Sequence, residues 1–253
     1  MSRSYLKGKR VLITRPEKDS GEFSALLAGQ GAEPAVIPLV GFIGRELHEE
    51  EMRKLQSASE YDWIIFTSKN GVRFFFKQAE EGTKLPNIAS IGDKTTESIK
   101  QKGYEPKFVP GEFVAEAFVE EFMPRLEAGS KILLVKGSLA RDLISTALEN
   151  HGHRCDEIIL YETVLPDGSA ALLKEALESE KLDIITFASS SAVHHFMRIV
   201  HAYKLEEKLD RCLFACIGPV AKKTAEAYGL SVPVCGNPYT MEGLFNSLSE
   251  YGT

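Results

Sequence analysis

Cysteine and tryptophan are scarce in this sequence, with four cysteines and one tryptophan among 253 residues. The cysteines, at positions 155, 212, 216 and 235, show no C-x-x-C spacing, so neither a zinc site nor a redox pair is indicated. Reduced and mostly buried thiols are typical of a cytosolic chain. A chain of this length can bury a sizeable core without disulfides or metals.

Long apolar runs are also missing. No segment reaches the roughly 18 residues of a membrane helix, and the N-terminal MSRSYLKGKRVLITRP lacks the apolar core of a signal peptide. The net charge of −6 argues against general binding to nucleic acid or to an anionic membrane, although a local basic cleft remains compatible with it. We therefore expect a soluble, cytoplasmic protein with no nucleic-acid or membrane partner.

The common cofactor and catalytic signatures are absent. The sequence contains no G-x-G-x-x-G after a strand, no G-x-x-x-x-G-K-[ST], no G-x-S-x-G and no H-E-x-x-H. His151 and His153 lack a partner at metal-ligand spacing, and no histidine accompanies a candidate nucleophile in a recognisable arrangement. The sequence predicts no cofactor and no metal, and it gives no support to covalent catalysis.

The sequence resembles itself in three segments. DWIIFTSKNGVRFFF from Asp62 aligns with DIITFASSSAVHHFM from Asp183, and GKRVLIT aligns with GSKILLV at the same offset. The SIGDKT segment aligns with CIGPVAKK, which brings Gly92 opposite Gly218. Because the order of the segments is preserved, the sequence predicts an internal duplication.

Each repeat alternates short β-branched runs with helical patterns, which is typical of crossover units on a parallel sheet. Apolar runs predict strands covered on both faces at 11–13, 63–66, 88–91, 132–135, 184–187 and 213–217. The helices between them are expected to end at glycines in the left-handed conformation, at 31, 103, 152 and 229. The predicted fold class is α/β, with two doubly wound, flavodoxin-like parallel-sheet domains.

Two divisions of the duplicated chain into domains are open. The simple division cuts near residues 127–130, and the other exchanges the first β-α-β piece of each repeat between the domains. The second is favoured by LVGFIG (39–44) and LYETVLPDG (160–168), two extended stretches where the chain could cross between domains. A two-segment linker of this kind would act as a hinge.

The strand-to-helix loops are the places where ligands are expected, because open parallel sheets bind them at the carboxyl ends of strands. These loops mix small, hydroxyl and glycine residues, and their amides and helix dipoles suit carboxylates or phosphates. Helix capping alone would also account for the serines, and a single basic residue is more often a solvated charge. The candidate binding residues are Arg15, Ser68, Lys69, Asn70, Thr95, Lys136, Gly137, Arg141, Ser189, Ser190, Gly218 and Pro219.

A series of short motifs runs through the sequence in the order VLITRP, DWIIFTSKNGV, SIGDKT, ILLVKGSLARDLI, LYETV, DIITFASSSAV, CIGPVAKKTAEAYGL and YTMEGL. The order of these motifs resembles the uroporphyrinogen-III synthase family almost from end to end. The resemblance implies the exchanged division, with residues 1–38 and 165–253 in one domain and 41–162 in the other. The crossings would be 39–44 and 160–168, and a substrate cleft would lie between the domains.

The resemblance also implies a cofactor-independent lyase of tetrapyrrole (heme) biosynthesis. Such an enzyme cyclises hydroxymethylbilane to uroporphyrinogen III with inversion of ring D and loss of water, and the preceding pathway enzyme is a further implied partner. Tyr161 in LYETV is similar to the tyrosine that assists departure of the hydroxyl group, although a packing role stays open. Ser68 and Thr95 match loop positions that contact the substrate.

The sequence departs from the family pattern in two loops. Val220 and Ala221 stand where some members carry consecutive threonines, and Lys136 stands where an arginine often precedes the glycine. Backbone amides would still bind carboxylates after both changes. Two alternatives remain: a non-catalytic two-lobe domain that binds a small anion or effector, and a two-domain transferase for a sugar or phosphate.

Overall fold

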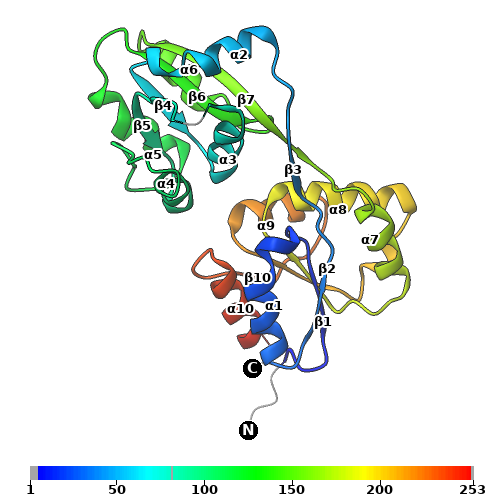
Figure 1. The fold of residues 1–253 in the computed structure, drawn as a ribbon. Coiled ribbons are helices and arrows are strands. Elements are labelled where there is room, and N and C mark those ends of the chain that lie inside the picture. The colour runs from blue at the N-terminus through cyan, green and yellow to red at the C-terminus, as the bar shows by residue number, and fades with distance from the viewer. Residues whose placement is uncertain (1–4, 81, 252–253) are drawn as a thin grey trace. The chain divides into compact units, whose positions relative to one another are not determined.

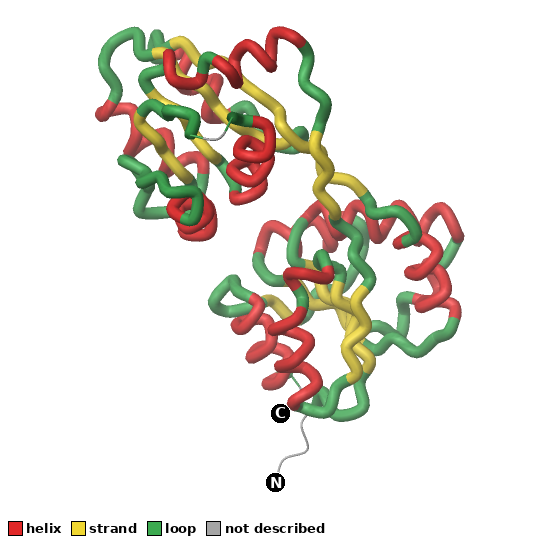
Figure 2. The backbone as a smooth tube through the Cα atoms, viewed as in Figure 1, coloured by secondary structure: helices red, strands yellow, loops and turns green. Residues whose placement is uncertain are grey.

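The computed structural model describes residues 5–80 and 82–251 (Figure 1). The chain forms two compact units: unit 1 contains the described residues up to Gly41 and from Val164 onward, and unit 2 runs from Phe42 to Thr163. The ends of the expected first domain, residues 1–4 and 252–253, lie outside the described residues. Figure 2 shows strands with helices on both sides in each unit, which confirms the α/β prediction.

The elements of unit 1, in chain order, are β1 (Arg10–Ile13), η1 (Glu17–Asp19), α1 (Gly21–Gly29), β2 (Glu33–Val36), α7 (Ser169–Glu178), β8 (Ile184–Phe187), α8 (Ser190–Tyr203), η4 (Glu206–Lys208), β9 (Leu213–Cys216), α9 (Pro219–Ala227), β10 (Val234–Cys235) and α10 (Met241–Glu250). In the described part of the chain they build a five-stranded sheet of order β10-β9-β8-β1-β2. Neighbouring strands in this sheet pair in parallel. Renumbered within the unit, the strand order is 2-1-3-4-5, a common order of open α/β sheets.

The elements of unit 2 are β3 (Gly41–Gly44), α2 (Glu49–Gln56), η2 (Ala58–Glu60), β4 (Trp63–Phe66), α3 (Lys69–Gln78), β5 (Asn87–Ser90), α4 (Asp93–Lys100), α5 (Ala115–Phe122), η3 (Met123–Arg125), β6 (Lys131–Gly137), α6 (Leu143–Asn150) and β7 (Arg154–Val164). The sheet has the order β3-β7-β6-β4-β5 within the described residues. The pairs β4–β5, β4–β6 and β6–β7 are parallel, and β3 lies at the edge beside β7.

The core of each unit lies on both faces of its sheet. In unit 1, Phe23 of α1 and Leu244 of α10 pack with Ile13 on one face, whereas α8 places Phe196 against Phe187 with 5.2 Å between ring centroids. In unit 2, α2, α3 and α4 cover one face and α5 and α6 the other. Burial on both faces explains why the central strands are continuous apolar runs.

The predicted strands are confirmed, with shifts at their ends. Trp63–Phe66 and Ile184–Phe187 have the expected bounds, but β6 continues through Gly137, two residues beyond the predicted end. The expectation that Lys136 and Gly137 lie in a loop is therefore wrong. The four glycines expected in the left-handed conformation adopt it, with φ of 79°, 85°, 81° and 84° at 31, 103, 152 and 229.

The cysteines are less buried than expected, since Cys216 is buried and Cys155, Cys212 and Cys235 are partly exposed. Burial raises the pKa of Cys155 and Cys216 to about 12 and that of Cys212 to about 11. These three thiols are therefore protonated and weakly nucleophilic at neutral pH.

None of the helices in residues 5–80 and 82–251 has the length and apolar character needed to cross a membrane.

Candidate functional site

The best-defined candidate site lies in unit 2, where Tyr161 of β7 meets Ser68 at the start of α3. The Tyr161 hydroxyl lies 2.9 Å from Ser68 Oγ, and either atom can be the donor. Ser68 is the N-cap of α3, and its Oγ accepts a hydrogen bond from the Gly71 N–H at 3.0 Å. Because the two hydroxyls share one hydrogen bond, the second O–H of the pair can donate to another group.

Two phenylalanines hold the ring of Tyr161. Phe74 of α3 stacks on it with centroids 5.5 Å apart and an interplanar angle of 16°, and Phe42 of β3 meets it edge-on at 5.8 Å. Only 7% of Tyr161 is exposed. Burial raises the pKa of the Tyr161 phenol, and the Ser68 hydrogen bond and Arg73 offset part of this effect. The phenol is consequently neutral at physiological pH and can donate a hydrogen bond.

Gly137 provides the space that the Tyr161 ring fills. The two residues are register partners on β6 and β7, next to an irregularity between Lys136 and Gly137. A Cβ atom at position 137 would lie within 2.7 Å of the phenol oxygen and 2.6 Å of Cε2. No side chain fits in that space, so the close approach of the ring requires glycine.

Lys136 has its charge paired within the same unit. It is 4% exposed, and its Nζ donates to Asp142 at 2.6 Å and to Glu157 at 2.7 Å. Burial lowers the pKa of Lys136, but the two carboxylate hydrogen bonds outweigh burial and leave that pKa raised. By the alternation of β6, Lys136 shares a face with Leu134, whereas Tyr161 packs on the other face. The structure thus does not bring Lys136 to Tyr161.

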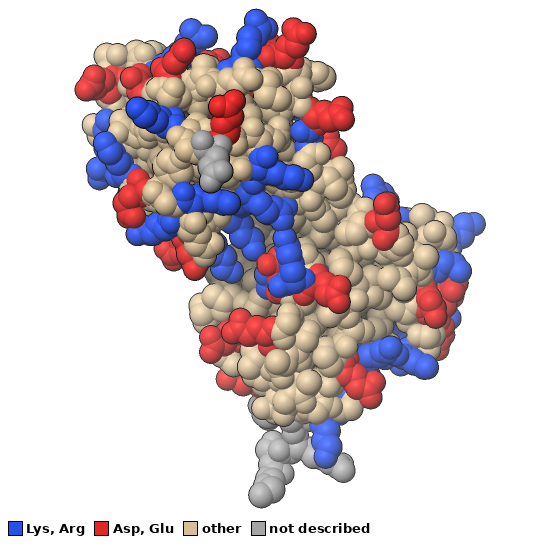
Figure 3. Space-filling model, in the orientation of Figure 1, with Lys and Arg blue, Asp and Glu red and all other residues tan. Residues whose placement is uncertain are grey.

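The remaining candidates of unit 2 lie at the starts of helices or in loops. Lys69 and Asn70 open α3, and Thr95 is buried in the first turn of α4. Arg141 is exposed and pairs with Glu116 at 2.8 Å. Figure 3 shows lysine and arginine side chains gathered over the part of unit 2 that contains α3 and α4. The sequences of these two helices supply Lys69, Arg73, Lys77, Lys94 and Lys100.

Unit 1 places its candidates at the carboxyl ends of β1, β8 and β9. Arg15 follows β1, and burial lowers the pKa of its guanidinium. Ser189 is the N-cap of α8 and accepts a hydrogen bond from the backbone N–H of Ala192 at 3.2 Å. Ser190 is the first residue of α8 instead of a cap, and its Oγ accepts a hydrogen bond from Thr224 at 2.8 Å.

Gly218 and Pro219 form the start of α9, with Gly218 as the N-cap and Pro219 as the first helical residue. Proline suits this position because its missing N–H would have no partner within the helix. The ring of Tyr239 packs over Gly218, with its nearest atoms 3.4 Å from the position that a Cβ would occupy. The two units therefore each offer helix N-termini at the carboxyl edge of a parallel sheet.

Phe42 and Phe74 were not predicted as partners of Tyr161. Phe42 lies in the extended LVGFIG stretch and Phe74 in the VRFFF run, so both positions were visible as apolar residues. Apolar pattern alone does not show which ring stacks on which, because the contact joins three separate elements. Finding the Tyr161 environment requires both the pairing of β3 with β7 and the packing of α3 on that face of the sheet.

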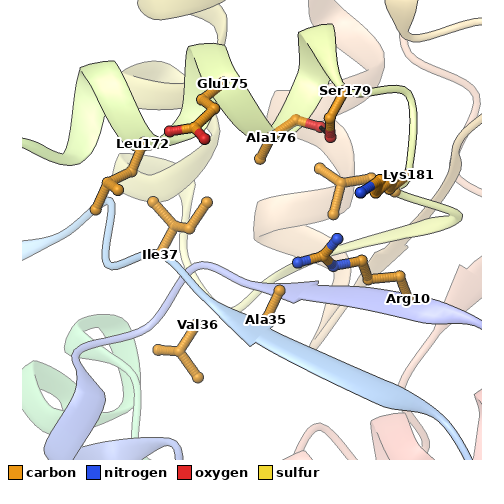
Figure 4. A pocket seen from close by; sticks show the side chains of 10 residues that line it. Arg10, Ala35, Val36, Ile37, Leu172, Glu175, Ala176, Ser179 and Lys181 are labelled. Atoms are coloured by element: carbon orange, nitrogen blue, oxygen red, sulfur yellow. Dashed lines mark hydrogen bonds between the residues drawn. The ribbon is translucent and has the colours of Figure 1, made fainter.

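A separate pocket lies in unit 1 between β2 and α7 (Figure 4). It has a volume of about 370 Å³ and an apolar wall that includes Ile37 and Leu172, with Arg10 and Lys181 at one end. Arg10 lies at the amino end of β1, which is the edge opposite to the ligand-binding edge of such sheets. None of the predicted site residues lines this pocket.

Similarity to known proteins extends over most of the chain. A family model described as uroporphyrinogen-III synthase HemD matches residues 21–246. The chain belongs to this family. The porphyrin biosynthesis protein HemD of Ruminiclostridium josui is 27% identical over 98% of this chain, which spans only 49% of that relative. The uroporphyrinogen-III synthase of Synechococcus elongatus is 28% identical, with 99% of this chain and 98% of that protein covered.

A solved structure agrees with this family assignment at the level of the fold. A mutant uroporphyrinogen III synthase from the extremely thermophilic bacterium Thermus thermophilus matches with a TM-score of 0.67 at 19% identity, covering 97% of this chain and 98% of that one. Membership in this family favours a uroporphyrinogen-III synthase over both alternatives considered from the sequence, the non-catalytic binding domain and the transferase.

Proposed function

We propose that this chain cyclises hydroxymethylbilane to uroporphyrinogen III, with inversion of ring D and loss of water, as a cofactor-independent lyase. The observation that carries the proposal is the Tyr161–Ser68 hydroxyl pair, 2.9 Å apart, in a chain whose residues 21–246 match the uroporphyrinogen-III synthase family. The pair supplies a neutral O–H donor at the carboxyl edge of a parallel sheet. This is the edge where open α/β sheets bind ligands.

The substrate is a polyanion, because its acetate and propionate groups are ionised at neutral pH. Helix N-termini suit such groups, since their backbone N–H groups and dipoles favour negative charge. The starts of α3 and α4 in unit 2 and of α8 and α9 in unit 1 meet this requirement. The three cationic side chains of α3 add positive potential despite the net negative charge of the chain, whereas Asp93 and Glu97 offset the two lysines of α4.

The first chemical step loses the elements of water from ring A. The hydroxyl leaves the hydroxymethyl carbon and the hydrogen comes from the ring A nitrogen, which gives an electrophilic azafulvene. Tyr161 would donate a hydrogen bond to the departing hydroxyl, either directly or through Ser68. The raised pKa of the Tyr161 phenol keeps this donor protonated.

The second step closes the ring with inversion of ring D. Ring D attacks the azafulvene through its substituted carbon, and the spiro intermediate fragments and recloses to uroporphyrinogen III. The protein contributes mainly by positioning the reacting carbons, an effect worth several kcal/mol of barrier. Enzymatic closure must be faster than spontaneous closure to the uninverted isomer.

In the proposed enzyme the chain is an internal duplication, and the first β-α-β piece of each repeat is exchanged between the two domains. One domain would comprise residues 1–38 and 165–253, the other 41–162, with 39–44 and 160–168 as a two-segment linker. Support comes from matching local geometry: Gly92 and Gly218 are N-caps of α4 and α9, each directly beyond a parallel strand. Ser68 and Ser189 are likewise N-caps, and the hydroxyl of each accepts a hydrogen bond from the backbone N–H three residues later.

The test is the isomer ratio of the product. Freshly prepared hydroxymethylbilane is incubated with the protein, the products are oxidised, and type I and type III porphyrins are separated. A synthase enriches type III over an enzyme-free control. An isomer ratio equal to that control contradicts the proposal, and heat-denatured protein checks that enrichment depends on the folded chain.

A further inference from the structure

Unit 2 exposes an aromatic ring at its ligand-binding edge. Phe113 is 50% exposed, and its ring and Cβ lie 3.6–3.9 Å from the position that a Cβ on Gly92 would occupy. Gly92 caps α4 with a φ of 87°, so the glycine both makes the turn and lets the ring approach the backbone. Phe113 comes directly before Val114, the N-cap of α5.

Unit 1 repeats this arrangement with Tyr239. It is 66% exposed, and its atoms lie 3.4–3.6 Å from the Cβ position of Gly218, the N-cap of α9. Tyr239 comes directly before Thr240, the N-cap of α10. Each unit therefore packs an aromatic residue over the glycine that opens the preceding helix.

The register of the neighbouring strands makes the two positions equivalent. In unit 2, Phe108 bridges in parallel to Ala89, and Phe113 follows five residues later. In unit 1, Val234 pairs in parallel with Ala215, and Tyr239 follows it at the same separation. The two units, which have different core residues, thus both have an exposed aromatic ring at the equivalent position.

The cores do not require either ring. Phe113 and Tyr239 are not core residues, since each has half or more of its surface exposed to water. Exposed apolar area has a free-energy cost that burial against a ligand would recover. An aromatic side chain also has few rotatable bonds, so contact through it has a small entropic cost.

We propose that Phe113 and Tyr239 are stacking surfaces for pyrrole rings of the linear tetrapyrrole; the inference rests on the proposed function. Pyrroles are flat and electron-rich, and they suit offset or edge-on contact with an aromatic ring. Their carboxylate side chains would reach the adjacent N-termini of α4 and α9. Amides then bind the charged groups while the two aromatic rings orient the pyrroles.

Paired variants test this proposal. Phe113→Ala and Tyr239→Ala are each expected to raise KM for hydroxymethylbilane about 2- to 10-fold, the range that one aromatic contact supplies. The share of type III product is also expected to fall in both alanine variants, since a loosely held substrate closes spontaneously. Phe113→Tyr and Tyr239→Phe keep KM within about 2-fold of the unmodified protein, because a stacking ring is retained.

A control and a second readout keep this inference separate from the proposed function. Leu172→Ala removes a similarly exposed apolar side chain from α7 and is expected to leave KM and the isomer ratio unchanged. Direct titration with uroporphyrin III, followed by its absorbance, measures binding without turnover. Weaker porphyrin binding by the two alanine variants supports stacking even if the unmodified protein does not enrich type III. Unchanged KM and unchanged porphyrin affinity in both alanine variants, or no porphyrin binding by the unmodified protein, would overturn the proposal.

Discussion

Gly137 and Tyr161 are register partners on adjacent strands, and the Tyr161 ring fills the space that a side chain at 137 would need. The glycine thereby sets how deeply the phenol enters unit 2. That depth determines the 2.9 Å contact between the Tyr161 hydroxyl and Ser68. The position of the proposed donor thus depends on a residue that makes no chemical contribution of its own.

Gly137→Ala is expected to reduce enrichment of type III porphyrin at least 10-fold, because the added methyl group displaces the ring. Overpacking of this kind also lowers the free energy of unfolding by about 1–3 kcal/mol. Urea unfolding and the isomer assay measure the two effects. Gly29→Ala is the matched control, since a Cβ there meets nothing within 4 Å. Normal activity in the Gly137 variant would contradict the account of Tyr161 placement.

Tyr161→Phe is expected to lower turnover at least 10-fold while leaving the melting temperature within a few degrees. The ring and its stacking on Phe74 remain, and Ser68 keeps its hydrogen bond from the helix backbone. Tyr61→Phe is a control in the same unit, because Tyr61 is also buried and donates to Asp156 at 3.0 Å. Equal turnover of the two variants would remove the chemical role of Tyr161.

The central part of the fold was predictable from the sequence because it depends on local pattern. Trp63–Phe66 and Ile184–Phe187 are short continuous apolar runs, the signature of strands buried on both faces. The strand β2 was not predicted, since it is a four-residue segment at the sheet edge that contains Pro34. Edge strands carry a weaker pattern because only part of their surface is buried.

The candidate site was predictable only in part. Ser68 and Tyr161 were both predicted as site residues. They lie 93 residues apart, however, and nothing in the sequence shows that their hydroxyls meet. Lys136 was expected in a loop, whereas it lies in β6 and pairs with Glu157 of the neighbouring strand. Such pairing depends on strand register, which a single sequence does not reveal.

Lys136→Met is expected to lower the free energy of unfolding by about 1–3 kcal/mol, because Glu157 and Asp142 lose their shared cation. The raised pKa of Lys136 means that its stabilising effect is complete below about pH 10, the unfolded value, and is lost as pH rises through the folded pKa. Urea unfolding from pH 7 to 11 measures this trend.

Two further variants make the Lys136 experiment specific. Adding Glu157→Gln should recover part of the lost stability, since it removes the uncompensated charge. Lys174→Met breaks an exposed pair with Glu178 and is expected to cost less than about 0.5 kcal/mol. KM of the Lys136 variant tests at the same time the prediction that this residue binds substrate. A Lys136→Met protein as stable as the original would show that the ion pairs contribute nothing.

Asp183→Asn is expected to destabilise the chain by about 1 kcal/mol at pH 7. The Asp183 carboxylate accepts from Lys9 Nζ at 2.9 Å and from the Arg10 N–H at 2.8 Å, so it joins the starts of β8 and β1. Burial raises the pKa of Asp183, but these hydrogen bonds outweigh burial and leave that pKa lowered. Its contribution is therefore present above the unfolded value of about 3.9 and is lost as pH falls through the folded pKa.

The gap in unfolding free energy between the original chain and Asp183→Asn should accordingly narrow as pH falls from 5 to 3. Urea unfolding at fixed ionic strength measures this gap. Asp210→Asn serves as the control, because an exposed surface substitution stays within about 0.5 kcal/mol. A gap that keeps its size down to pH 3 would mean that the charge of Asp183 does not stabilise the contact between the starts of β8 and β1. The protonated Asp183 side chain, hydrogen-bonded to Lys9 and Arg10, would then stabilise the chain as well as the carboxylate does.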